Sequence, residues 1–231
     1  MTLQTRDRAV LVLEDGRRWE GRAYGARGRT LGEIVFATGM TGYQETLTDP
    51  SYAGQIVVMT APHVGNTGMN DEDPESSRIW VAGYAAHSPS RVASNHRSSR
   101  TLDADLERDG IVSISGIDTR ALTRHLRDRG AMRSGIFSGE DAALEPEEQL
   151  ALVLESPGMS GRNLSAEVST DANYTVPARG ERIGSVAIVD LGIKAATINK
   201  LADRGFDVHV VPESVTVDEL YALEPLSLIH I

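Results

Sequence analysis

Cysteine is absent from all 231 residues of the chain. Its absence excludes disulfide bonds, thiolate metal sites and a cysteine nucleophile from these residues. Long apolar runs are missing as well, because none approaches the roughly 20 residues that a membrane-spanning helix requires. Residues 1–9 lack the apolar core of a secretion signal. We therefore expect a cytoplasmic protein with no membrane partner.

Basic residues are also fewer than acidic ones. The chain has 23 Lys and Arg against 33 Asp and Glu, which gives a net charge of −10 and an isoelectric point near 5.1. Proteins that bind nucleic acid need a basic face to replace phosphate counterions. We expect an acidic, solvated surface and no nucleic-acid partner. The hydrophobic share of 40% is enough for the core of one large or two modest domains.

Residues 1–165 predict a mixed α+β domain. An apolar strand begins at Ala9 and breaks at Asp15-Gly16, which is a strong hairpin signal. Asp118 or Thr119 caps a helix that ends near Gly130. The other expected elements are strands at 33–37, 55–59 and 111–115 and a helix at 102–108.

A further helix is expected from Glu145-Pro146, since proline is tolerated at the first helical position. Leu150, Val153 and Leu154 follow at helical spacing. We expect these three side chains to form the buried apolar face of this helix.

Residues 166–183 contain Gly, Ser, Asn and Pro without clear periodicity and predict a linker. A different pattern follows. The elements expected are a strand, a helix, a strand and a helix, at 185–190, 194–204, 206–211 and 216–223. Strand, helix and strand in this order predict a right-handed βαβ unit. We therefore expect residues 184–231 to begin a doubly wound α/β domain.

The most informative stretch is the polar, glycine-punctuated run at 38–55, which we call the signature run. Gly39, Gly42 and Gly54 permit backbone angles that are closed to other residues, and Asp49-Pro50 favours a turn. Predicted strands precede and follow the run. We expect an exposed loop that presents a rigid binding surface.

Two segments of the signature run, Thr41-Gly-Tyr-Gln-Glu45 and Leu47-Thr-Asp-Pro-Ser-Tyr52, resemble the carbamoyl-phosphate synthase small chain family. Departures from the family pattern occur at Ala61, Leu191 and Ala195. Further segments match that family in order along the chain, at 11–16, 32–36, 62–68, 70–76, 93–97, 116–131 and 189–194.

The resemblance implies a fold and an activity. It implies an α+β N-terminal domain of the β/β/α small-subunit type, followed by the start of a class I glutamine amidotransferase domain. The family's small chain hydrolyses glutamine, and the ammonia passes to a large subunit that uses ATP and Mg to make carbamoyl phosphate. This reaction serves arginine and pyrimidine synthesis. The implied partners are L-glutamine and the large subunit, in a heterodimer, with no cofactor in this chain.

The resemblance also implies site residues. Ser51 matches a serine that contacts bound glutamine, and its hydroxyl suits an amino-acid ligand because it both donates and accepts hydrogen bonds. Lys194 matches a lysine at the mouth of the glutaminase domain. The cysteine, histidine and carboxylate of the reaction lie beyond residue 231 in the family. We therefore expect no catalytic residue, no metal site and no glutamine hydrolysis by this chain alone.

The family pattern predicts a truncated chain. Residues 226–231 could pass for a strand, whereas relatives continue with a strand that leads into an Asn-Gly-Pro-Gly-type loop. Our hypothesis is that these last six or so residues come from a truncated or misread gene.

Several residues have simpler interpretations. Without the resemblance, Ser51 is a serine after proline in a turn. The segment 65–68 lacks the lysine of a phosphate-binding loop and reads as a structural turn. Asp118 and His125 could be drawn as parts of a hydrolytic triad, but no nucleophile elbow is present. The six histidines have no close metal-ligand spacing.

Two charged features leave room for other roles. Asp190 lies at the carboxyl end of a predicted parallel strand, where α/β sheets bind ligands, so a nucleotide pocket is conceivable. Arg120, Arg124 and Arg127 form a basic stripe along one helix that is either merely exposed or contacts an acidic partner subunit. The alternative functions are a non-catalytic docking module and a flavodoxin-like small-molecule-binding protein.

Overall fold

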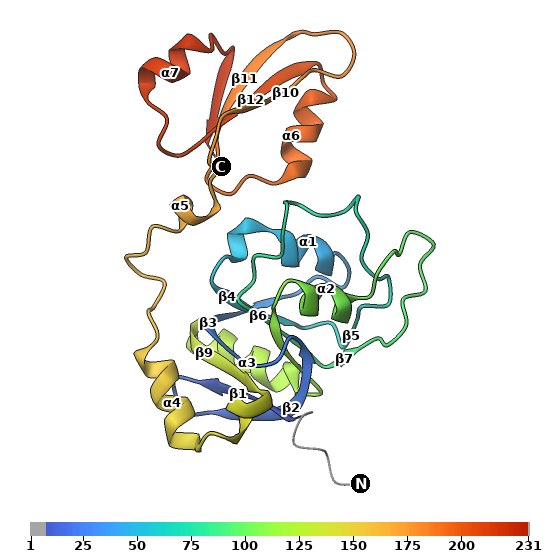
Figure 1. The fold of residues 1–231 in the computed structure, drawn as a ribbon, viewed down its shortest axis with the longest axis vertical. Coiled ribbons are helices and arrows are strands. Elements are labelled where there is room, and N and C mark those ends of the chain that lie inside the picture. Colours follow the sequence, from blue (N-terminus) through green and yellow to red (C-terminus); the bar gives the residue numbers. More distant parts are fainter. Residues whose placement is uncertain (1–7, 231) are drawn as a thin grey trace. The chain divides into compact units, whose positions relative to one another are not determined.

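The computed structural model describes residues 8–230. Within them the chain divides into two compact units (Figure 1). The first unit comprises residues 8–48 and 54–161, and the second comprises 49–53 and 162–230. The short segment 49–53 therefore belongs with the C-terminal part of the chain, although the first unit flanks it in sequence.

Seven strands of the first unit form a closed barrel in the order β1-β2-β8-β6-β4-β3-β9. The strands β3, β4, β6 and β8 run parallel to one another, and the other neighbouring pairs are antiparallel. This sheet-rich unit has the mixed character that the sequence predicts. The bounds are β1 Arg8–Leu13, β2 Arg18–Gly25, β3 Arg29–Ala37, β4 Gln55–Met59, β6 Gly83–Ala86, β8 Val112–Ser115 and β9 Met132–Ser138.

The barrel begins with the predicted hairpin. β1 pairs antiparallel with β2, and the Leu13 amide donates to the Arg17 carbonyl at 2.9 Å. Gly16 has a φ of 83° in the turn, a conformation that favours glycine. The Asp15-Gly16 signal is therefore confirmed.

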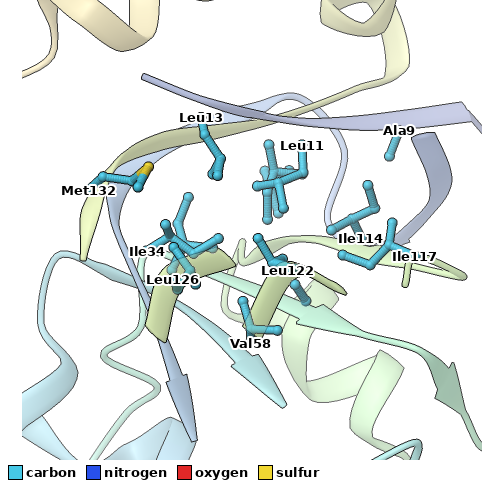
Figure 2. Packing of buried hydrophobic residues seen from close by; sticks show 14 residues of the cluster. Ala9, Leu11, Leu13, Ile34, Val58, Ile114, Ile117, Leu122, Leu126 and Met132 are labelled. Carbon is cyan, nitrogen blue, oxygen red and sulfur yellow. The ribbon is translucent and has the colours of Figure 1, made fainter. Parts of the chain in front are cut away.

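Apolar side chains from opposite walls of the barrel point toward one another and form its core (Figure 2). Leu11, Ile34 and Ile114 come from three different strands and are fully buried. The helix α3, Thr119–Arg129, adds Leu122 and Leu126 to this core. Its cap agrees with the prediction, because the Asp118 carboxylate accepts from the Ala121 amide at 2.9 Å.

Shorter elements complete the first unit. The helix α2, Leu102–Arg108, is confirmed at its predicted position and packs on β2 and β8. A 3-10 turn at Gly139–Ala143 leads into α4, Pro146–Glu155. A small parallel pair joins β5, His63–Val64, to β7, Ser88–Pro89.

The expected buried face of α4 is wrong at one residue. Val153 is fully buried, but Leu154 is 44% exposed. The core on this side of the unit consists of Val153 with Val10 and Val12 of β1 and Phe137 of β9, and Leu150 packs against it. Leu152 of α4 packs against the same cluster, whereas Leu154 does not belong to it.

The signature run is only partly the exposed loop that we expected. Residues 38–41 are exposed, but α1, Tyr43–Thr48, follows immediately and buries Tyr43, Gln44, Leu47 and Thr48. The polar atoms of this helix are satisfied inside the protein, so a polar composition did not imply exposure. The prediction of a loop at 43–48 is wrong for that reason.

The second unit is built on a four-stranded sheet in the order β10-β12-β11-β13. β11, Gly184–Val189, is parallel to β12, Phe206–Val211, and α6, Ala195–Ala202, connects them as the predicted βαβ pattern requires. β13, Ser227–His230, adds a third parallel strand. β10, Tyr174–Val176, is antiparallel to β12 and lies within the segment that the sequence predicts as a linker.

Two short helices accompany this sheet. α5 spans Leu164–Val168. α7, Val217–Ala222, has the capping box between Thr216 and Glu219, which explains why its start could be predicted. Among residues 8–230, none of the helices combines the length and the apolar character needed to cross a membrane.

Candidate functional site

Ser51 lies in a short 3-10 turn, Pro50–Tyr52, that belongs to the second unit. Asp49 caps this turn with an extended backbone, and its Oδ1 accepts a hydrogen bond from the Ser51 amide at 2.9 Å. The Asp49 carbonyl also accepts from the Tyr52 amide at 3.1 Å. The turn leaves the Ser51 side chain exposed while Asp49 and Pro50 are buried.

Lys194 occupies the position that precedes α6 and has an extended backbone there. Its Nζ forms an ion pair with Asp49 Oδ2 at 2.7 Å. The Asp49 side chain is 8% exposed and the Lys194 side chain 45% exposed. One buried carboxylate therefore holds both residues that the resemblance points to, one by its backbone amide and one by its ammonium group.

The turn before Lys194 is shaped by Asp190, which is buried at the end of β11. Its Oδ1 accepts from the amides of Gly192 and Ile193, both at 2.9 Å, and its Oδ2 accepts from the Thr170 amide at 2.9 Å. Three backbone donors thus use the carboxylate that could have served a nucleotide pocket. In this unit Asp190 has a structural role.

Gly192 brings this turn against the segment 49–53. It has a φ of 109°, and a Cβ at this position would lie 3.2 Å from both Pro50 Cβ and Val168 Cγ2. Any larger residue would be strained in backbone angle and crowded against Pro50. The close approach keeps the turn that carries Lys194 next to the turn that carries Ser51.

Asp49 is a site residue that the sequence alone does not reveal. The Asp-Pro pair indicates only a turn, and the partner Lys194 is far away in the chain. The available signal was the match of the whole Asp-Pro-Ser-Tyr motif, in which the aspartate is as diagnostic as the serine.

The helix α1, just before Asp49, is anchored within the first unit by two polar side chains. Gln44 is 6% exposed and makes a paired contact with the Asn70 backbone, since its Nε2 donates to the carbonyl at 2.6 Å and its Oε1 accepts from the amide at 3.0 Å. The Tyr43 hydroxyl donates to the Gly68 carbonyl at 2.7 Å and accepts from Thr67 at 2.7 Å. These contacts explain how a polar run folds into a buried helix.

A cavity of about 560 Å³ lies beside α1 in the same unit. Arg100 and Arg108 reach its lining and both pair with Oδ1 of the buried Asp105, at 2.8 and 2.9 Å. Hydrogen bonding with Arg108 lowers the pKa of Asp109 from its usual value. Arg100, Arg108, Asp105 and Asp109, four of the charged residues of the lining, are therefore already paired with one another.

The remaining candidate motifs have structural roles. The amide of Gly68 donates to the carbonyl of Gly65, so the segment 65–68 is a turn as predicted. His125 Nε2 lies 2.7 Å from Asp15 Oδ2, whereas Asp118 caps α3, so the two residues do not form a triad. Among the described residues, no group of three or more His, Cys, Asp and Glu side chains is arranged to hold a metal ion.

The basic stripe on α3 is exposed. Arg120, Arg124 and Arg127 all lie on the solvent-facing side of the helix, while Leu122 and Leu126 face the core.

Comparison with known proteins decides the family. Residues 11–136 match the model of the carbamoyl-phosphate synthase small chain, CPSase domain. The chain belongs to the carbamoyl-phosphate synthase small chain family. The matched segment includes the end of β1, the barrel strands from β2 to β8, most of β9 and the whole signature run.

Curated relatives carry the same family name. The chain is 65% identical over 217 residues to the carbamoyl phosphate synthase small chain of Streptomyces coelicolor, covering 94% of this chain and 57% of the relative. It is 62% identical over 230 residues to that of Streptomyces avermitilis, covering 97% and 60%. It is 56% identical over 232 residues to that of Bifidobacterium longum, covering 95% and 57%. The chain thus spans less than two thirds of the length of these small chains.

Proposed function

We propose that this chain provides the glutamine-facing turn of a glutamine-hydrolysing carbamoyl-phosphate synthase. The family match supports this proposal, together with the arrangement in which Asp49 holds both Ser51 and Lys194. In the complete enzyme, the ammonia released from glutamine passes to the large subunit, which consumes ATP with Mg. The product is carbamoyl phosphate for arginine and pyrimidine synthesis in the cytoplasm.

In this proposal Ser51 contacts the glutamine substrate directly. An exposed hydroxyl can donate to the α-carboxylate of the ligand or accept from its α-ammonium group. The bond from the Ser51 amide to Asp49 fixes the backbone of the turn and leaves the side chain to the ligand. Lys194 contributes a positive charge at the same turn, and Asp49 keeps its ammonium group in place.

We assign the bond-breaking step to residues outside these 231. Hydrolysis of a side-chain amide by this class of enzyme requires a thiolate nucleophile, a base and donors for the oxyanion. The chain has no cysteine. The second unit would then be the beginning of the amidotransferase domain, consistent with its parallel β11 and β12.

A glutaminase assay tests this proposal. The 231-residue chain alone should release no ammonia from glutamine, whereas a full-length small chain that carries this sequence, together with its large subunit, should form carbamoyl phosphate from glutamine and ATP. Glutamine hydrolysis by the chain alone would overturn the assignment of the nucleophile. A full-length complex that forms carbamoyl phosphate only from free ammonia would instead favour a non-catalytic docking module.

A further inference from the structure

Three hydroxyl-bearing residues face one another across adjacent strands of the barrel. Tyr24 on β2 is opposite Ser113 on β8, and Ser113 is in turn opposite Tyr84 on β6. One position further along, Ala23 and Ala85 are both opposite Ile114, and this row packs in the barrel core. Since side chains alternate between the two faces of a strand, Tyr24, Ser113 and Tyr84 occupy neighbouring positions on the outer face of the barrel wall.

This part of the outer face is covered. Tyr84 and Ser113 have no exposed surface. The helix α2 packs on β2 and β8 there, and its Leu106 is fully buried. The Asp103 carboxylate of α2 accepts from the Gly25 amide at 2.8 Å and fixes the helix next to Tyr24.

Two of these hydroxyls are buried without a hydrogen-bond partner. Within residues 8–230, no protein atom bonds to the Tyr24 or the Tyr84 hydroxyl, although both are shielded from solvent. The nearby Tyr43 differs, because its hydroxyl is satisfied by Gly68 and Thr67. Buried polar groups in native proteins are almost always paired, with protein or with ordered water.

The protonation state limits what can pair with them. Burial raises the pKa of Tyr24 and of Tyr84 above the usual value, so both phenols are neutral and carry a proton to donate. The Asp103 carboxylate also raises the pKa of Tyr24, and the same negative charge disfavours a bound anion. Ser113 donates to the Ile111 carbonyl at 3.2 Å and still has lone pairs that can accept.

We propose that Tyr24, Ser113 and Tyr84 line a site for ordered, buried water that accepts hydrogen bonds from both phenol hydroxyls. A water oxygen accepts two hydrogen bonds and its hydrogens can be donated to Ser113 or to a neighbouring water. Buried waters typically make about three hydrogen bonds in this way. The water joins β2 to β6 beneath α2, so the hydroxyls of Tyr24 and Tyr84 gain a hydrogen-bond partner without a charged ligand. This site does not depend on the proposed enzymatic function.

A crystal structure of the 231-residue chain, at a resolution that shows ordered solvent, tests the proposal. The site predicts a water oxygen within about 3.2 Å of each of the two hydroxyls. In crystals of Tyr84→Phe or Tyr24→Phe, the electron density of this water should be absent or displaced, because one of its hydrogen-bond donors is gone. Crystals grown with bromide separate water from a halide, because bromide at the site would give an anomalous signal and would overturn the proposal.

Oxygen-17 relaxation dispersion provides the solution test. The number of long-lived internal waters should fall by at least one in Tyr84→Phe, and the melting temperature should decrease. The control is Tyr43→Phe, whose hydroxyl already has protein partners and which should leave the count unchanged. An unchanged count in both Tyr84→Phe and Tyr24→Phe, with a melting temperature that stays the same or rises, would show that the hydroxyls are unpaired and would overturn the proposal.

Discussion

Lys194 forms an ion pair with Asp49, a residue that the first unit flanks in sequence but that packs in the second unit. The Nζ to Oδ2 distance is 2.7 Å, and the aspartate is the more buried partner at 8% exposure. The other oxygen of the carboxylate accepts from the Ser51 amide. Asp49 is therefore the group that links the two residues indicated by the family resemblance.

We expect Asp49→Ala to destabilise the segment 49–53. The change removes the partner of Lys194 and the side chain that caps the Pro50–Tyr52 turn, and losing a cap of this kind costs about 0.5–2 kcal/mol. Hydrogen exchange at the Ser51 amide should accelerate accordingly. The matched control is Asp203→Ala, because Asp203 pairs with Arg179 on the surface with side chains 54% and 55% exposed. That change should cost less than about 1 kcal/mol. Equal hydrogen-exchange rates of the Ser51 amide in the wild type and in Asp49→Ala would contradict the proposal that Asp49 holds this turn.

Gln44→Ala should destabilise the first unit. It leaves the buried backbone amide of Asn70 without its acceptor and removes the shorter of two hydrogen bonds to the Asn70 carbonyl, which keeps Arg100 at 3.5 Å. An unsatisfied buried group costs about 1–3 kcal/mol. Both tryptophans, Trp19 and Trp80, lie in this unit, so urea unfolding followed by tryptophan fluorescence reports on it. As a control, Gln55→Ala loses a half-buried contact with Glu33 and should cost less. If the two variants unfolded at the same urea concentration, the two hydrogen bonds between Gln44 and the Asn70 backbone would not contribute more to stability than the Gln55 contact.

The helix α4 offers a comparison of two neighbouring residues. Val153→Ala removes buried methyl groups from a packed cluster and should lower the free energy of unfolding by about 1.5–3 kcal/mol. Leu154→Ala removes a larger but half-exposed side chain and should cost less than about 1 kcal/mol. Urea unfolding of both variants measures the difference. A larger loss for Leu154→Ala would mean that α4 packs through a different face.

The first unit should lose stability in acid. A hydrogen bond from the side-chain amide of Asn70, and a second from the Arg97 guanidinium, lower the pKa of Asp73. A hydrogen bond from Arg108 lowers the pKa of Asp109. A carboxyl whose pKa is depressed by folding contributes stability above its unfolded pKa, near 3.9, and the contribution is lost as pH falls through the folded value. Unfolding measured between pH 6 and 3 should show a steeper loss in the wild type than in Asp73→Asn/Asp109→Asn. Parallel pH profiles would rule out these two carboxylates as the cause.

Local signals made much of the fold predictable. The hairpin at Asp15-Gly16, the helix capped by Asp118 and the capping box at Thr216 depend on residues close together in sequence. Closure of the barrel depends on the pairing of β1 with β9, two strands that are far apart in the sequence. No short-range pattern encodes such a pairing, so barrel closure could not be predicted from the sequence.

The candidate site was predictable in part for the same reason. Ser51 and Lys194 could be named from motifs, but the carboxylate that holds them acts across a long stretch of chain. The burial of α1 was missed because Gln44 looks like a surface residue until its partner Asn70 is known. Long-range polar contacts thus account for the main errors.

Kinetics of Ser51→Ala in a full-length small chain assembled with its large subunit test the proposed substrate contact most directly. The KM for glutamine should rise about tenfold or more, because a hydrogen bond to a charged ligand group contributes roughly 1.5–3 kcal/mol. Synthesis from free ammonia should not change, and the exposed control Ser214→Ala should behave as wild type in both reactions. An unaltered KM for glutamine in Ser51→Ala would contradict the placement of glutamine at this turn.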